Sequence, residues 1–132
     1  MGTFQNAKEA QDYFTHDRFA TENGMRVDEL GEDWCTCSFD VTDHHKNASG
    51  GVMGGAMFTL ADLAFAVCSN QIHQPTVAQQ VSLNFLRGTE GKKIIAHAKC
   101  RKTGRSSSII QIDMEDDAGR DIASFVFTGF KL

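Results

Sequence analysis

Asp62 is the side chain in this sequence with the clearest potential for chemistry, because it interrupts a run of apolar residues, Leu60–Phe65. An unpaired carboxylate in an apolar environment is costly, and its pKa is raised. The sequence therefore predicts a buried Asp62 that serves either a structural partner or a reaction. Thr59 and Ser69 fall on the same stripe of a helix, which predicts a small polar seam beside the carboxylate.

A glycine-rich segment, Gly50–Gly55, precedes the residues around Asp62. Backbone N–H groups at a helix N-terminus can bind a developing oxyanion, and glycines leave such groups accessible. Glycines before a helix are also typical of a tight turn. The N–H of Gly54 is the candidate oxyanion donor.

The spacing of these two groups limits how they can cooperate. Asp62 follows Gly54 by eight residues, which is roughly 12 Å along a helix axis. A carboxylate that serves a carbonyl bound at Gly54 therefore has to come from another chain. A two-fold dimer with antiparallel helices would provide it.

The patterns around these residues predict an α+β domain over residues 1–132. Gly54 to Asn70 is almost uniformly apolar and too long for a typical strand, so it predicts a buried helix. Residues 6–19 predict a short amphipathic helix, and Trp34–Val41 alternates like a strand. Alternating segments at 77–85, 94–101, 108–115 and 122–130 predict a four-stranded antiparallel meander. The sheet is expected to wrap around the long helix.

Composition excludes several classes of partner. The 132 residues carry 17 acidic and 13 basic side chains, and this net charge of −4 offers no positive field for nucleic acid or an anionic membrane. The longest apolar stretch is shorter than the roughly 20 residues that span a bilayer, and no signal-peptide pattern opens the chain. We therefore expect a cytoplasmic protein without nucleic-acid or membrane partners.

The four cysteines form no C-x-x-C pair. They are Cys35, Cys37, Cys68 and Cys100. Their spacing suits neither a disulfide framework nor a zinc site, so we interpret them as reduced core residues and predict no metal site.

The segment from Asn47 to Asp62 resembles a known family signature. It places Asn47, then a glycine pair, then Leu60-Ala61-Asp62 at the spacing found in hotdog-fold acyl-CoA thioesterases of the phenylacetate-degradation (PaaI) type. In that family the pattern is an Asn, then His-Gly-Gly, then Leu-Ala-Asp. The resemblance extends over nearly the whole chain.

This resemblance implies a hotdog fold, a homodimer that pairs again into a dimer of dimers, and active sites between subunits. By position, Asp62 is the general base or nucleophile, Gly54 is the oxyanion donor, and Asn47 positions water or substrate. Gly55 and Thr59, next to these groups on the helix, are expected to contact the substrate. Coenzyme A enters as part of the substrate, and no cofactor is expected.

Met53 departs from the family pattern, because it stands where a His usually precedes the glycine pair. Its side chain cannot donate a hydrogen bond or carry a proton, although it can still line the substrate site. His44 and His45 are near enough in sequence to supply an imidazole, but loop histidines are more often solvated.

Two further regions are candidates for substrate binding. Gln79 breaks the apolar register of its strand, which makes it a better candidate than Gln80 to reach the reaction centre. Residues 91–112 contain six basic and no acidic side chains, which is typical of a solvated face or of a phosphate-binding patch. The resemblance places Arg105 and Ser106 near the nucleotide, so we expect them to bind coenzyme A.

The expected function is hydrolysis of a small aromatic or medium-chain acyl-CoA to free acid and coenzyme A. A hotdog protein that binds acyl-CoA without hydrolysing it is one alternative, and Met53 is its main support. A dehydratase of the same fold is another, and the missing His disfavours it. Four apolar side chains are candidates either to line the acyl pocket or to pack in the core: Met57, Phe58, Phe65 and Phe85.

Overall fold

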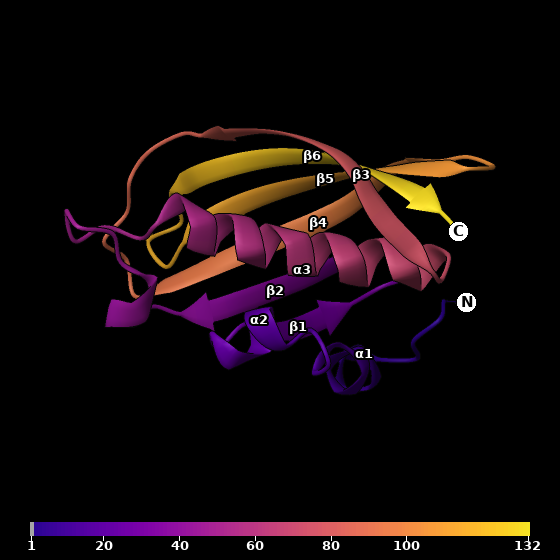
Figure 1. Ribbon diagram of the computed structural model, residues 1–132, viewed down its shortest axis with the longest axis horizontal. Coiled ribbons are helices and arrows are strands. Elements are labelled where there is room, and N and C mark those ends of the chain that lie inside the picture. Colours follow the sequence, from indigo (N-terminus) through magenta and orange to yellow (C-terminus); the bar gives the residue numbers. More distant parts are fainter. Residues whose placement is uncertain (1) are drawn as a thin grey trace.

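The computed structural model describes residues 2–132 as one antiparallel sheet that curves around a long helix (Figure 1). The sheet order is β1-β2-β4-β5-β6-β3. The strands are β1 (Arg26–Leu30), β2 (Trp34–Asp40), β3 (Thr76–Phe85), β4 (Lys93–Thr103), β5 (Ser107–Asp116) and β6 (Asp121–Lys131). The helices are α1 (Ala7–Phe14), α2 (Arg18–Glu22), the 3-10 turn η1 (Asp43–His45) and α3 (Gly54–Ile72). The predicted α+β architecture is confirmed.

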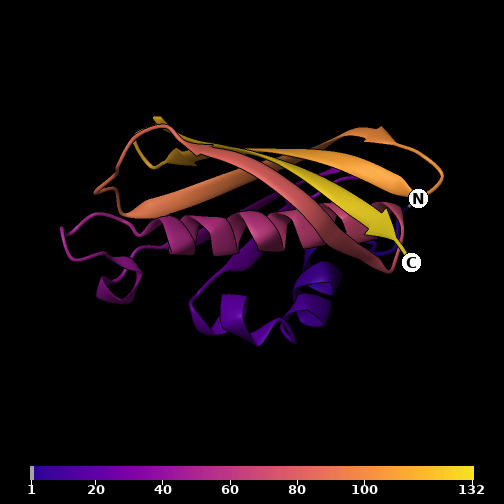
Figure 2. The same ribbon diagram turned by 45° about the horizontal axis from the view of Figure 1, so that its top comes forward.

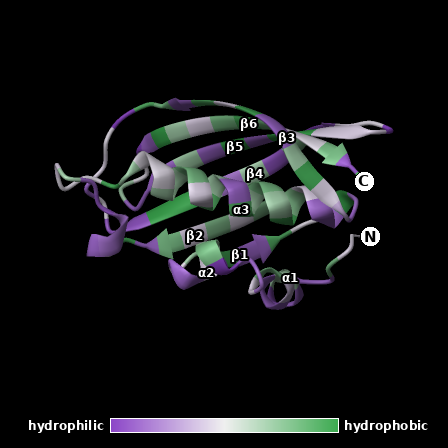
Figure 3. Cartoon of the chain, in the orientation of Figure 1, coloured by the Kyte–Doolittle hydropathy of each residue, from purple (hydrophilic) through white to green (hydrophobic). Residues whose placement is uncertain are grey.

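Helix α3 forms the centre of the core. It packs on the concave face of the sheet, and α1 and α2 lie on its other side, so that α3 is the middle layer (Figure 2). Hydrophobic residues extend along most of its length (Figure 3). Leu60, Ala64 and Phe65 are buried against inward-facing strand residues such as Ile112 and Phe127, and Phe65 stacks on Phe127 with ring centres 4.7 Å apart. The predicted helix is therefore confirmed, with two more residues at its end.

The N-terminal third differs from the prediction. Residues 6–19 do not form one helix, because α1 ends at Phe14 and α2 begins at Arg18. The Thr15 hydroxyl donates to the Gln11 carbonyl and supports this break. Strand β1 was not predicted, because it has few apolar residues and is interrupted by a bulge between Val27 and Glu29.

The predicted meander is also wrong in part. Strands β4, β5 and β6 follow one another, but β3 pairs with β6, and β2 takes the edge of β4 where β3 was expected. The segment 86–92 therefore does not form a hairpin turn, and it connects β3 at one edge of the sheet to β4 in its interior. The consequence is that β3 is an edge strand.

The cysteines are free, and three of the four are buried. Burial raises the pKa of Cys68, so this thiol is not a nucleophile at neutral pH. Within residues 2–132, no group of three or more His, Cys, Asp or Glu side chains is arranged to hold a metal ion. No helix in that same range is long and apolar enough to cross a membrane.

Candidate active site

The start of α3 presents unpaired backbone donors. Met53 is the N-cap residue, and its side chain makes no capping hydrogen bond. No acceptor in residues 2–132 engages the N–H of Gly54 or of Gly55. Helix N-termini carry partial positive charge, so these two N–H groups can bind an anionic oxygen.

A side chain from β3 lies close to Gly54. A Cβ atom at Gly54 would lie 3.0 Å from Cζ of Phe85, the last residue of β3. Phe85 is half exposed, so it covers one side of the helix start without burying it. Glycine therefore lets the end of β3 contact the first turn of α3 closely.

Asp62 lies on the face of α3 that points away from the sheet. The prediction that it is buried is wrong for a single chain, because the neighbouring α2 covers only part of that face and leaves the carboxylate exposed. The polar seam is absent too, since the Thr59 and Ser69 hydroxyls donate to carbonyls of α3 itself. Partial desolvation, reinforced by the nearby Asp17, nevertheless raises the pKa of Asp62.

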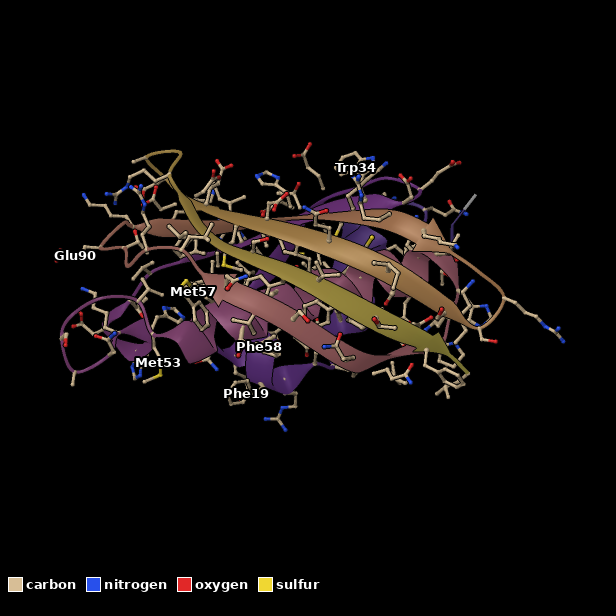
Figure 4. The ribbon with its side chains drawn as sticks, turned by 90° about the horizontal axis from the view of Figure 1, so that it is seen from above. Phe19, Trp34, Met53, Met57, Phe58 and Glu90 are labelled. Atoms are coloured by element: carbon tan, nitrogen blue, oxygen red, sulfur yellow. The ribbon has the colours of Figure 1, made fainter. Side chains whose placement is uncertain are left out.

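An apolar cleft lies between α2 and the first two turns of α3. Phe19, Met25, Met53 and Ala56 line it together with the rim residue His44. Phe19 is 76% exposed and also borders the cleft that contains Asp62. Figure 4 shows Met53, Phe58 and Phe19 on one side of the molecule and Trp34 on the opposite side.

The two histidines beside this cleft differ in their surroundings. His45 is buried against Phe39, its Nδ1 accepts from the Thr42 N–H at 2.9 Å, and its Nε2 donates to the Asn23 carbonyl at 2.7 Å. Both ring nitrogens are therefore engaged in holding the loop. His44 is exposed at the cleft rim.

Asn47 holds its own loop. Its Oδ1 accepts from the N–H groups of Ser49 at 2.9 Å and Gly51 at 3.2 Å, and Gly50 has a positive φ of 91°. This arrangement leaves the Asn47 Nδ2 group as the donor that can reach water or substrate. The loop leads directly into α3.

The remaining predicted site residues lie elsewhere in the single chain. Gln79 is exposed at a bulge of β3, about 20 Å along the strand from Phe85 and the start of α3. Arg105 and Ser106 are exposed in the β4–β5 turn, at the end of the sheet opposite the start of α3 (Figure 1). One chain therefore does not bring its candidate base, donor and nucleotide-binding residues together.

Other predicted roles also change in the structure. Met57 and Phe65 are core residues, whereas Phe58 is half-buried beside Asp62 and Phe85 contacts Gly54. Sequence reasoning missed Phe19, because residues 6–19 were assigned to one helix whose apolar face was expected to pack inward.

Comparison with known proteins gives a consistent family. The thioesterase superfamily matches residues 49–123. Acyl-coenzyme A thioesterase PaaI of Escherichia coli K12 is 27% identical over 113 residues, which cover 85% of this chain and 81% of that relative.

Two solved structures share the fold. The structure of E. coli PaaI, from the phenylacetic acid degradation operon, has a TM-score of 0.89 at 24% identity and covers 95% of this chain and 91% of that chain. A hypothetical thioesterase of Streptococcus pneumoniae TIGR4, solved with coenzyme A, has a TM-score of 0.81 at 21% identity and covers 89% of this chain and 94% of its own. The chain therefore belongs to the thioesterase superfamily, as a thioester hydrolase with the hotdog fold and of the phenylacetate-degradation (PaaI) type.

Proposed function

We propose that the protein hydrolyses acyl-CoA thioesters to a free acid and coenzyme A in active sites shared between two subunits. The observation that carries this proposal is the outward face of α3, which combines unpaired N–H groups at Gly54 and Gly55 with the carboxylate of Asp62. The names of the E. coli and S. pneumoniae relatives support a coenzyme A ester as the substrate.

The proposed chemistry needs one hydrogen-bond donor to the thioester carbonyl oxygen and one activated oxygen as the nucleophile. The thioester carbonyl oxygen accepts a hydrogen bond from the Gly54 N–H, which stabilises the negative charge that develops on it. Asp62 removes a proton from the attacking water, or attacks the carbonyl itself and forms an anhydride that water then hydrolyses. Coenzyme A leaves as a thiolate, which needs little acid assistance. Asn47 Nδ2 is proposed to orient the water or the substrate, and the reaction needs no resident cofactor.

The assembly follows from the exposed edge of the sheet. Strand β3 presents its outer edge over the ten residues Thr76–Phe85, and none of them is charged or Pro. Such an edge is a template for pairing with another chain. Two-fold pairing of β3 with its copy runs antiparallel and sets the two α3 helices antiparallel. Asp62 of one subunit then faces Gly54 of the other.

We expect the protein to be a dimer, or a dimer of dimers, at micromolar concentration. Light scattering should give a mass of at least twice the 14.5 kDa of one chain. Replacing Val81 in the middle of β3 is a poor test, because it also contacts the core. Ser82→Lys instead places a charge on an exposed position of this edge strand, where lysine opposes pairing with another chain, and should weaken the assembly. A single-chain mass for the wild type would contradict both the dimer and the shared site.

The substrate is proposed to occupy two regions. The acyl group enters the apolar cleft formed by Phe19, Met25, Met53 and Ala56, next to the Gly54 and Gly55 N–H groups. In this position Met53 contributes apolar surface where the family usually has an imidazole, and Gly55 and Thr59 form the cleft wall. The cleft is open, so it does not by itself select an aromatic over an aliphatic chain.

The nucleotide is proposed to lie on residues of the second subunit. Within one chain, Arg105 and Ser106 are too far from the start of α3, but the two-fold axis turns their end of the sheet toward the other active site. Gln79, near the proposed β3–β3 contact, is likewise closer to the other subunit's site than to its own. Arg105 would bind phosphate through its forked donors.

A hydrolysis assay over a panel of acyl-CoA esters tests the proposed function. Free coenzyme A is detected as a thiol, and the panel contains acetyl, hexanoyl, octanoyl, decanoyl, benzoyl and phenylacetyl esters. We expect turnover for at least one ester whose acyl group fills the cleft and little for the acetyl ester. Binding without thiol release across the whole panel would favour the non-catalytic alternative.

The pH dependence of turnover provides a separate test of Asp62. A base acts in its ionised form, so the rate should rise as pH increases through the raised pKa of Asp62. Asp17 contributes to this shift, whereas the neighbouring Arg18 is paired with Glu22 at 2.6 Å. We therefore expect Asp17→Asn to move the acid limb of kcat to lower pH. The measurement is a kcat–pH profile from pH 3.5 to 8. An unchanged acid limb would show that Asp17 does not raise the pKa of Asp62.

A further inference from the structure

Asp116 is a buried carboxylate that has no role in the proposed mechanism. It is the last residue of β5, it is 0% exposed, and it is the sole carboxylate side chain among the buried polar groups of residues 2–132. Its Oδ1 accepts from the N–H groups of Ala118 and Arg120, and its Oδ2 accepts from the Arg120 guanidinium and the Thr89 hydroxyl. Burial acts to raise the pKa of Asp116, but these hydrogen bonds together lower it to about 2.

Thr89 connects this carboxylate to the start of α3. Its hydroxyl donates to Asp116 Oδ2 at 2.8 Å and accepts from the Gly91 N–H at 3.0 Å. Its backbone carbonyl accepts from the Val52 N–H at 3.1 Å. Thr89 therefore fixes the crossing segment 86–92 to β5 on one side and to the segment before α3 on the other.

The residues before α3 have few other supports. The Met53 N–H donates to the His45 carbonyl at 2.8 Å, and the α3 N-terminus has no side-chain cap. Two backbone carbonyls, those of Thr89 and His45, thus fix Val52 and Met53 from two directions. Gly54 follows at once, so the direction of its N–H depends on where these two carbonyls are.

We propose that Thr89 and Asp116 are positioning residues for the oxyanion donor at Gly54. This inference rests on the proposed function, because the donor matters only if a thioester carbonyl binds there. Thr89 and Asp116 do not contact the substrate in this scheme. They set the position of the Val52–Gly54 segment through two hydrogen bonds that meet at Thr89: its hydroxyl donates to the Asp116 carboxylate, and its carbonyl accepts from the Val52 N–H.

Replacing the hydroxyl without changing the shape of the side chain tests this chain of contacts. Thr89→Val keeps the branched shape of Thr89 but removes its bonds to Asp116 and Gly91, whereas Thr89→Ser keeps the hydroxyl. We expect Thr89→Val to lower kcat about tenfold, a part of the 10²-fold that a 1 Å misplacement can cost, and to leave KM within about twofold. Thr89→Ser should retain near-normal kcat.

A matched control separates positioning from stability. Ser38 is also buried, and its hydroxyl donates to a carboxylate, that of Asp28, on the face of β2 that points away from α3. Ser38→Ala should lower the melting temperature while kcat per folded molecule stays unchanged. Asp116→Asn provides a second variant in case Thr89→Val folds poorly, and it should lower kcat without moving the acid limb that belongs to Asp62.

Amide hydrogen exchange adds a readout that does not require turnover. Exchange at the Val52 N–H should become faster in Thr89→Val than in Thr89→Ser or Ser38→Ala. Unchanged Val52 exchange, or a Thr89→Val protein with lower melting temperature but normal kcat, would overturn the positioning role. A wild type that turns over no ester would instead refute the proposed function, and the exchange comparison would still decide whether Thr89 holds Val52 in place.

Discussion

Asp62→Asn should lower turnover at least about 10²-fold, the lower range for loss of a positioned base. Asparagine keeps the size of the side chain and its hydrogen-bonding reach, but it can neither take a proton from water nor attack a carbonyl. Because the substrate is held by the apolar cleft and by its nucleotide, KM should change little. The measurement is steady-state kinetics on the best ester of the panel.

The stability of this variant gives an independent result. A carboxylic acid whose pKa is raised in the folded protein binds its proton more tightly there than in the unfolded chain, so its ionisation lowers stability as pH rises above the unfolded pKa. Near neutral pH, Asp62→Asn removes this effect. The melting temperature of the variant should therefore equal or exceed that of the wild type.

A matched control for this change is Asp113→Asn. Asp113 is an exposed residue of β5, opposite Ser124 and remote from α3's outward face. The Asp113→Asn substitution should leave both turnover and melting temperature near wild-type values. Undiminished turnover in Asp62→Asn would remove Asp62 from the mechanism, and a lower melting temperature with normal turnover would assign it a structural role.

The fold was predictable where a local pattern is decisive. The apolar run from Gly54 predicted the central helix, and alternation predicted the five strands β2 to β6, because the period of the apolar residues follows which side chains are buried. Strand order depends on contacts between segments far apart in the chain. No local feature of residues 86–92 indicates that β3 crosses over to pair with β6, and β1 has too few apolar residues to produce a pattern.

The candidate site was predictable in its residue types but not in its surroundings. The spacing of Gly54 and Asp62 along one helix predicted that one active site takes these two groups from two subunits. The exposure of Asp62 in a single chain agrees with this prediction. Burial of Asp62 was inferred from apolar neighbours in sequence, yet those neighbours face the sheet while Asp62 faces outward. The link from Asp116 through Thr89 to Val52 joins three segments distant in sequence, so only the fold reveals it.

Gly54→Pro should abolish the oxyanion donor without unfolding α3. Gly54 is the first residue of the helix, a position where proline is favoured because its missing N–H bonds to nothing in the helix. Met53 has φ −67° and ψ 138°, which is compatible with a following proline. Loss of one oxyanion donor typically costs about 10²–10³-fold in kcat, and we expect a loss in that range.

Gly54→Ala is the matched control, because it adds the same Cβ beside Phe85 but keeps the N–H. Phe85 is half exposed and free to turn aside, so Gly54→Ala should retain most of the wild-type kcat. Equal losses in the two variants would show that the contact with Phe85, and not the missing donor, limits the rate.

Mixing the two inactive variants tests the shared site directly. If each site takes Asp62 from one subunit and Gly54 from the other, a dimer of Asp62→Asn with Gly54→Pro has one site with both changes and one site with neither. Random reassortment of equal amounts makes about half of the dimers mixed, so activity should recover to about a quarter of the wild-type value. If both groups came from one chain, every site in the mixture would carry one of the changes, and activity would stay as low as in the separate variants. Recovery therefore places Asp62 and Gly54 of one active site on different subunits.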